Sequence, residues 1–179
     1  MDLTIKKISL FDLDELQAIS TQTFIDTFAA DNTESDMNEY LSTAFSKQKL
    51  SEELQAENSE FYFAELGDQV VGYLKINVGS SQKFFKTESA LQIERIYVLQ
   101  HYQGQKIGKK LFQKALDIAS AKQAAFIWLT VWEHNNKALA FYKNYGFAEH
   151  DRCVFTLGSD EQYDIVMKLE LHPQTNPDV

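Results

Sequence analysis

The chain has 179 residues, of which 44% are apolar, a length that accommodates one full hydrophobic core but not two. Its 26 acidic and 17 basic side chains give a formal net charge of −9, which disfavours nucleic acid and anionic membranes as partners and favours cations, although solubility alone also explains many acidic proteins. No apolar run approaches the roughly 20 residues of a membrane span and no signal-peptide core follows Met1, so we expect a cytoplasmic protein that does not enter a membrane.

We expect a single domain over residues 1–171, followed by a frayed polar tail over residues 172–179 that holds both prolines. The lone Cys153 excludes an internal disulfide and is expected to be a buried structural thiol rather than a nucleophile. The four histidines show no ligand spacing, so no metal site is predicted. A dinucleotide-binding glycine fingerprint is also missing after the early strands, which disfavours a nicotinamide cofactor.

The N-terminal part predicts one short strand and three helices. The strand covers residues 3–8. The helices cover residues 12–28, residues 35 or 36 to 45, with a Ser/Asp pair as the cap, and residues 49–55. Five carboxylates in and between the first two helices form either a solvated helical face or a rim that attracts a cationic substrate. They are Asp26, Asp31, Glu34, Asp36 and Glu39.

A change to strand character follows at residue 61. Residues 61–66 and 70–76 predict a hairpin, because the intervening Gly67 and Asp68 supply the positive φ that a two-residue turn needs. Residues 90–98 predict a third strand of mixed polarity. This strand leads directly into a turn that contains glycine.

That turn separates the strand ending at Val98 from an amphipathic helix that runs from about Lys109 to Lys122. A helix start presents unpaired N–H groups at the positive end of its dipole, so we predict that the turn binds a pyrophosphate; the alternative is an ordinary loop before a helix. Residues 126–131 then predict a central strand, which a right-handed crossover places in the same sheet as the strand before the turn. The turn comprises Gln103, Gly104, Gln105, Lys106, Ile107 and Gly108.

The last predicted helix is capped near Asn135 and ends at Gly146. Spacings of three and four residues place Asn135, Ala138 and Tyr142 on one helical face. Residues 152–157 and 163–171 predict a terminal antiparallel pair joined across residues 158–161.

Two of these segments resemble motifs of the GNAT superfamily of acetyl-CoA-dependent N-acetyltransferases. Residues 98–108 resemble the family's Arg/Gln-x-x-Gly-x-Gly/Ala pyrophosphate loop, and residues 135–147 resemble its Asn-x-x-Ala…Tyr…Gly-Phe helix. The resemblance implies a mixed α/β fold with a mostly antiparallel sheet of about six or seven strands and helices on both faces. One departure is Lys106, which stands where the pattern has its first glycine, so that position cannot use a glycine-only conformation cheaply.

A closer resemblance, to polyamine N-acetyltransferases of the PaiA type, rests on residues 23–28, 93–98, 127–133 and 140–143. It implies a primary amine of spermidine or spermine as the acceptor. Two alternatives stay open. The acceptor is another amine, such as a protein N-terminus, a Lys side chain or a drug, or the chain is a non-catalytic CoA-binding regulator. Both a monomer and a homodimer fit the sequence.

The resemblance also assigns roles to single residues. Tyr142 is the expected general acid that protonates the departing thiolate, the alternative being a core tyrosine. Asn135 is expected to contact CoA, with a plain helix cap as an equal alternative. The residues expected at acetyl-CoA are Val98, which offers its N–H to the thioester oxygen, Gln103, Gly104, Gln105, Lys106, Ile107, Gly108, Lys109 and Asn135.

The acceptor amine is protonated near neutral pH and must lose a proton before it attacks. Glu94, in the strand before the turn, is the expected base, acting through water, and an ion pair with Arg95 is an equally good explanation of it. Tyr97 is a weaker candidate for the base. Lys106 either contacts the pyrophosphate or is a plain surface lysine.

Overall fold

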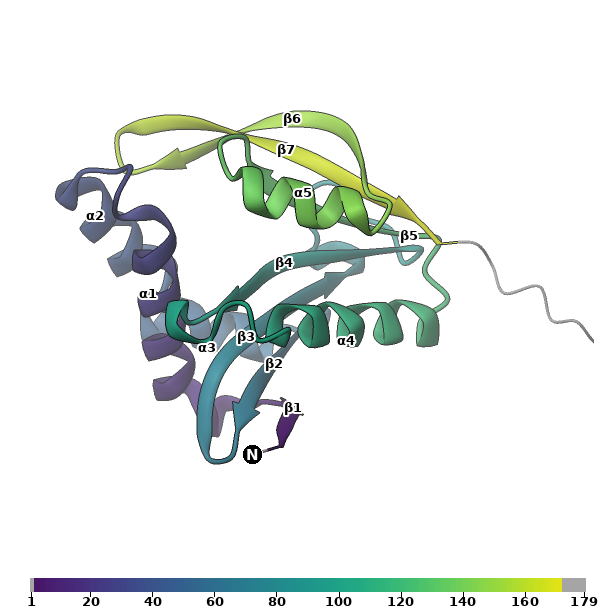
Figure 1. The fold of residues 1–179 in the computed structure, drawn as a ribbon, viewed down its shortest axis with the longest axis horizontal. Helices are drawn as coiled ribbons and strands as arrows, with labels where there is room; N and C mark the ends of the chain where they lie inside the picture. The colour runs from purple at the N-terminus through teal and green to yellow at the C-terminus, as the bar shows by residue number, and fades with distance from the viewer. Residues whose placement is uncertain (1, 172–179) are drawn as a thin grey trace, which may run out of the picture.

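The computed structural model describes residues 2–171, so the tail expected over residues 172–179 lies outside the described part. A seven-stranded sheet with the order β1-β2-β3-β4-β5-β7-β6 runs through the molecule (Figure 1). Only β4 and β5 pair in parallel, which confirms the expected mostly antiparallel sheet. The strands are β1 (Leu3–Lys7), β2 (Ser59–Leu66), β3 (Gln69–Val78), β4 (Ala90–Val98), β5 (Phe126–Trp132), β6 (Ala148–Leu157) and β7 (Asp160–Glu170).

Five α-helices cover the two faces of this sheet within residues 2–171. Three come from the N-terminal part and lie on one face, and α4 and α5 lie on the other (Figure 1). Over the same residues, no helix combines the length and the apolar character that a membrane crossing requires. The helices are α1 (Leu13–Phe28), α2 (Glu34–Ala44), α3 (Lys47–Gln55), α4 (Ile107–Ala121) and α5 (Asn136–Asn144).

Alternation along β2 shows how one strand serves both layers. Tyr62 and Ala64 belong to the core beneath α4 and α5, whereas Phe61 and Phe63 belong to the core beneath α1, α2 and α3. Successive side chains of a strand point to opposite faces, so an apolar run without polar interruption predicts a strand covered on both sides. The sheet therefore separates two hydrophobic cores.

Beyond a short paired stretch, the parallel strands β4 and β5 separate. Their register runs only from Ala90 opposite Phe126 to Gln92 opposite Trp128. A register shift opposite β3 then inserts Glu94 as an extra residue in β4. In Figure 1 the strands β6 and β7 accordingly diverge from β2, β3 and β4 toward the left of the view. The backbone of β4 after Gln92 has no ladder partner on its β5 side within the described chain.

Two predicted boundaries need correction. The turn between β6 and β7 has two residues, Gly158 and Ser159, instead of the four expected, because the positive φ of +59° at Gly158 permits a tight hairpin. Helix α4 begins at Ile107, two residues before the expected start. Ile107 and Gly108, expected in the turn, therefore belong to the first helical turn.

The hairpin turn of β6 and β7 is bound to the start of α2. The backbone N–H of Ser159 donates to Oδ1 of Asp36 at 2.6 Å, and the Ser159 hydroxyl donates to the same atom at 2.9 Å. The hydroxyl of Thr33, the N-cap of α2, donates to Oδ2 of Asp36 at 2.6 Å. Asp36 is consequently 8% exposed and joins the first helices to the last hairpin.

Candidate functional site

Two cavities on opposite faces of the sheet meet at the gap between β4 and β5. The α1–α3 cavity, which has a volume of about 610 Å³, lies between helices α1 to α3 and the sheet and is lined by Phe24, Tyr40, Phe45, Glu53 and Asn77, among others. The α4–α5 cavity, of about 840 Å³, opens at the start of α4. The residues that line both cavities are Ile96, Tyr97, Trp132, Asn135, Ala138 and Tyr142.

At the entrance to α4 the backbone adopts two left-handed conformations. Gly104 has a φ of +82°, and Lys106, the residue before the first helical turn, has a φ of +63°. Lys106 therefore adopts the left-handed conformation, which costs more free energy for a lysine than for the glycine of the family pattern. The conformation turns the chain so that α4 begins directly at the cavity, at a cost of about 1 to 2 kcal/mol for a residue with a Cβ.

Gln103 links this turn to both neighbouring elements. Its side-chain amide donates to the carbonyl of Val98 at 3.3 Å and accepts from Nζ of Lys137 at 2.9 Å. The turn is thereby held between the end of β4 and the start of α5. An added Cβ at Gly104 would meet nothing within 4 Å, so the turn leaves open space above its backbone.

The remaining predicted turn residues, Gln105, Ile107 and Gly108, differ in how they relate to the α4–α5 cavity. Gly108 and Lys109 line the α4–α5 cavity, together with Val98 and Lys106. Ile107 also lines the cavity, but its side chain is 3% exposed and packs in the core, which leaves only its backbone for a ligand. Gln105 is exposed and does not line the cavity.

On α5, two predicted site residues lie at the junction of the cavities. Asn135 is the N-cap, and its Oδ1 accepts from the N–H of Ala138 at 3.1 Å, so the cap interpretation holds. Tyr142 is 7% exposed and packs against Phe112 and Phe147. Burial raises the pKa of its phenol well above the ordinary value, so the hydroxyl stays protonated at neutral pH.

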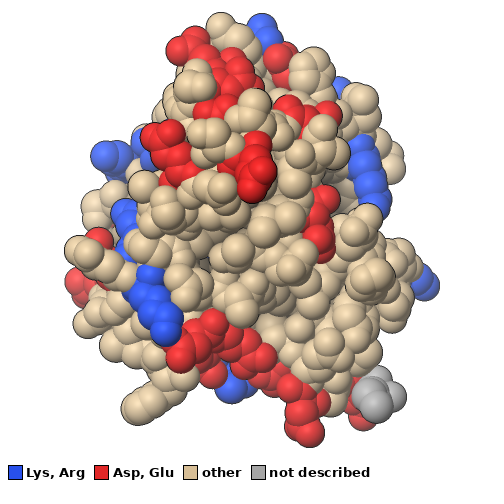
Figure 2. Space-filling model, turned by 90° about the vertical axis from the view of Figure 1, so that its left-hand side faces the viewer, with Lys and Arg blue, Asp and Glu red and all other residues tan. Residues whose placement is uncertain are grey.

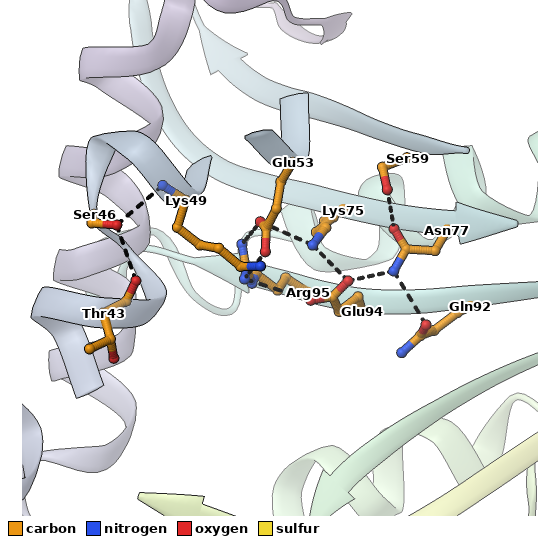
Figure 3. A network of polar contacts seen from close by, with 10 residues as sticks. All are labelled: Thr43, Ser46, Lys49, Glu53, Ser59, Lys75, Asn77, Gln92, Glu94 and Arg95. Carbon is orange, nitrogen blue, oxygen red and sulfur yellow. Dashed lines mark hydrogen bonds and ion pairs between the residues drawn. The ribbon is translucent and has the colours of Figure 1, made fainter. Parts of the chain in front are cut away.

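Four charged side chains from α3, β3 and β4 form an ion-pair network on the wall of the α1–α3 cavity (Figure 3). Nζ of Lys75 lies 3.0 Å from Glu53 and 2.7 Å from Glu94. The guanidinium of Arg95 lies 2.8 Å from Glu53 and 3.6 Å from Glu94. The amide of Asn77 donates to Glu94 as well. The predicted ion pair between Glu94 and Arg95 is therefore present, but Lys75 makes the shorter contact.

This network sets the protonation of Glu94. Burial alone would raise the pKa of its carboxyl, but the neighbouring Lys75 and Arg95 outweigh burial and hold the pKa below the ordinary value. Burial and the nearby phenol of Tyr73 raise the pKa of Tyr97 well above its ordinary value, which leaves Tyr97 neutral. Glu94 is thus the anionic one of the two candidate bases at neutral pH.

Sequence reasoning missed Glu53, Lys75 and Asp164, which all line the α1–α3 cavity. One signal was present, since Lys75 interrupts the otherwise apolar run of residues 70–76 and is only 3% exposed. A lysine is almost never fully buried without a partner, so its position predicts nearby carboxylates. Nothing in the local sequence indicates that Glu53 and Glu94 are those carboxylates.

The acidic rim expected around α1 and α2 is not where the carboxylates of the α1–α3 cavity are. Asp26 lines the α4–α5 cavity, Asp36 is bound to the hairpin turn, and none of the five predicted carboxylates lines the α1–α3 cavity. Figure 2 shows the side of the molecule that lies on the left in Figure 1. The acidic side chains on this side gather mainly in the upper part of the view and along its lower edge. Three of the five, Asp31, Glu34 and Glu39, are exposed and fit the alternative of a solvated acidic face, whereas Asp26 and Asp36 do not.

Other reactive groups lie outside the junction. Cys153, on β6 opposite Asp164, is half-buried, and burial raises the pKa of its thiol, which makes it a weak nucleophile. Over residues 2–171, no group of three or more His, Cys, Asp or Glu side chains is arranged to hold a metal ion.

Comparison with known proteins shows which family and which relatives this chain is similar to. The model of the acetyltransferase (GNAT) family matches residues 22–147. An uncharacterised N-acetyltransferase of Lactobacillus delbrueckii subsp. lactis is 38% identical over 167 residues, which cover 93% of this chain and 96% of that protein. The spermidine N(1)-acetyltransferase of Thermoplasma acidophilum is 26% identical over 164 residues, which cover 89% of this chain and 94% of that protein.

Solved structures agree on the fold. The crystal structure of PaiA N-acetyltransferase from Thermoplasma acidophilum in complex with coenzyme A superposes with a TM-score of 0.79 at 24% identity, covering 96% of this chain and 100% of that chain. The ribosomal-protein-S18-alanine N-acetyltransferase of Escherichia coli gives a TM-score of 0.72 at 18% identity, covering 97% of this chain and 98% of that chain. Both superpositions cover nearly the whole chain and therefore show its fold.

Proposed function

The chain belongs to the GNAT family and is an acetyl-CoA-dependent N-acetyltransferase, and we propose that its acceptor is a primary amine of a polyamine such as spermidine or spermine. Two cavities meet at the gap between β4 and β5, and Tyr142 lines both of them. This observation supports the transfer of an acetyl group from a ligand in one cavity to a ligand in the other. The polyamine assignment rests on the likeness to the spermidine acetyltransferase over nearly the whole chain.

The α4–α5 cavity fits the cofactor. Unpaired N–H groups in the first turn of α4, together with the helix dipole, are suited to a pyrophosphate, and Lys106 and Lys109 add positive charge beside it. The open space over Gly104 leaves room for the phosphates. Acetyl-CoA supplies the acetyl group as a thioester when it is bound. After Gln92 the backbone of β4 has no ladder partner on its β5 side within residues 2–171, so its N–H groups, including that of Val98, are available to bind the arm and the thioester oxygen. The carbonyl of Val98 already accepts from Gln103.

In this proposal Tyr142 donates the proton that the departing sulfur takes up. The neutral amine nitrogen forms a bond to the acetyl carbon and releases its extra proton to water, the carbon–sulfur bond breaks, and the sulfur leaves as a thiol after it accepts the phenolic proton. The phenolate of Tyr142 then regains a proton from water. Burial raises the pKa of the phenol, but the same buried site also disfavours the thiolate that forms beside it. The two effects oppose one another, so the transfer remains feasible.

Glu94 is proposed to accept the proton of the ammonium group through water. Its lowered pKa makes it a weak base but keeps it anionic over the whole physiological pH range. Because the pKa of an alkylammonium group is far above that of Glu94, only a small fraction of the amine is free to react at neutral pH. Deprotonation is therefore expected to limit the rate at low pH.

A second acceptor class is favoured by the charges in the α1–α3 cavity. Its four carboxylates are matched by four basic groups, so the cavity as a whole is not acidic. Among residues 2–171, Lys49 and Lys83 line it without an ion-pair partner. An amine that also carries a carboxylate, such as an amino acid or a peptide, would pair with one of these lysines.

Free-thiol release from acetyl-CoA across a panel of amines tests the proposal. The panel contains spermidine, spermine, butylamine, amino acids and a lysine peptide, each at several concentrations. The highest kcat/KM is expected with the polyamines. Preferential turnover of amino acids or peptide would replace the polyamine assignment, and release with no amine would leave only CoA binding.

A further inference from the structure

Asp164 is a carboxylate of the α1–α3 cavity that forms no ion pair with any other residue of the range 2–171. It lies on β7 directly opposite Trp132 of β5, and Trp132 lines both cavities at their junction. Neighbouring strands are about 4.8 Å apart, so Asp164 is one strand away from the place where the two ligands meet. Its side chain points to the cavity side of the sheet, as does Thr130.

Each of the other carboxylates of this cavity is either ion-paired or exposed to water. Glu53 and Glu94 are paired with Lys75 and Arg95, and Glu52 is exposed on α3. Asp164 is half-buried, and within the described chain no Lys or Arg forms an ion pair with it. Its remaining charged neighbour, Lys83, is itself exposed to water.

The surrounding residues stabilise the negative charge of Asp164 only in part. Burial raises the pKa of Asp164, and the hydroxyl of Thr130 and the charge of Lys83 offset only some of that effect. A cation from the ligand would add the pairing that the protein does not supply. This distinguishes Asp164 from Glu94, whose charge is already balanced by two basic side chains.

We propose that Asp164 binds a second ammonium group of the acceptor and so selects diamines and polyamines over monoamines. The reacting amine lies at the junction beside Tyr142, and the second nitrogen lies one strand away, against β7. This inference rests on the proposed function, because it names the part of the α1–α3 cavity that would recognise a polyamine. It also explains how a cavity of balanced charge can favour a polycation.

Putrescine and butylamine, which share a four-carbon chain and differ in the second amine, are the matched pair for the test. In Asp164→Asn the KM for putrescine is expected to rise about tenfold, because a charge-assisted hydrogen bond becomes a neutral one. The KM for butylamine and both kcat values are expected to change less than twofold. Intact butylamine turnover also shows that the variant is folded. Asp160→Asn is the control, since Asp160 is exposed on the same strand and bonded to Gln162.

Equal changes for both amines, or no change for putrescine, would overturn the role of Asp164. If no amine is acetylated, the proposed function fails, and calorimetry with putrescine alone then decides the binding question. Binding to the wild type that is lost in Asp164→Asn supports the subsite without catalysis. Equal binding to the two proteins, or no binding to either, rules the subsite out.

Discussion

Nζ of Lys75 lies 2.7 Å from Oε2 of Glu94, and Lys75 is only 3% exposed. The residue proposed as the base is therefore ion-paired before any acceptor enters the cavity. A buried pair of this kind contributes little net stability, but removing one partner leaves the other charge buried and unpaired. Glu94 thus has a structural role that can be measured separately from its proposed catalytic one.

Glu94→Gln is expected to lower the free energy of unfolding by about 3 kcal/mol near pH 7, because Lys75 and Arg95 lose a counter-charge. A carboxyl whose pKa is lowered on folding stabilises the protein above its unfolded pKa of 4.5, and this contribution is lost as the pH falls through the lower folded value. Urea unfolding near pH 7 and well below pH 4.5 should therefore give a larger and a smaller difference from the wild type. A difference of equal size at both pH values would contradict this account.

The matched control is Glu52→Gln, on the exposed side of α3. It removes the same charge from the same cavity wall without unpairing a buried cation. Its free energy of unfolding is expected to stay within about 0.5 kcal/mol of the wild type at both pH values.

Tyr142→Phe is expected to lower kcat about a hundredfold and to leave the KM for acetyl-CoA within twofold. The substitution removes only the hydroxyl, and the ring contacts with Phe112 and Phe147 remain. Steady-state kinetics at saturating amine measure the effect. Tyr145→Phe is the control, because Tyr145 lines the α4–α5 cavity but not the junction. An unchanged kcat in Tyr142→Phe would remove the general-acid role.

Replacement of Lys106 separates its backbone strain from its charge. Lys106→Gly removes both, whereas Lys106→Ala removes the charge and keeps a Cβ at a φ of +63°. Lys106→Gly is expected to be about 1 kcal/mol more stable than Lys106→Ala in urea unfolding. Both variants should show a similar rise in the KM for acetyl-CoA, roughly threefold at low salt and smaller at high salt. A rise in the glycine variant alone would show that the backbone, and not the ammonium group, holds the phosphates.

Gly158→Ala tests the contact between the hairpin turn and α2. A Cβ at this position would lie 2.2 Å from Oδ1 of Asp36, in addition to the cost of a positive φ. The free energy of unfolding is expected to fall by about 2 to 3 kcal/mol, and the KM for the amine to rise more than that for acetyl-CoA. Gly104→Ala isolates the backbone cost, since its φ is also positive and its Cβ would meet nothing within 4 Å. Similar losses of stability in the two variants would argue against a tight contact at Asp36.

Local patterns predicted most of the fold. Helical spacing placed α1, α4 and α5, alternation and apolar runs placed β2 to β5, and the start of α4 was off by only two residues. The turn before α4 and the cap at Asn135 were predictable because both depend on neighbours in sequence. These features need no knowledge of which segments later lie side by side.

The network around Lys75 shows why the rest was not predictable. Its partners come from residues 53 and 94, and only the packing of α3 over the sheet brings them together. The separation of β4 from β5 likewise depends on an extra residue in β4 and on the pairing of β5 with β7. No local pattern encodes such a gap, although it defines the junction of the two cavities.

The contact between Asp36 and Ser159 can form only late in the synthesis of the chain. Asp36 leaves the ribosome 123 residues before its partner, so a nascent chain that already contains α4 and α5 still lacks the hairpin that holds α2. Phe155 of that hairpin packs against Tyr40 on the wall of the α1–α3 cavity. All residues that line the α4–α5 cavity, the last of which is Tyr145, therefore leave the ribosome before Phe155 and Asp164, which complete the lining of the α1–α3 cavity.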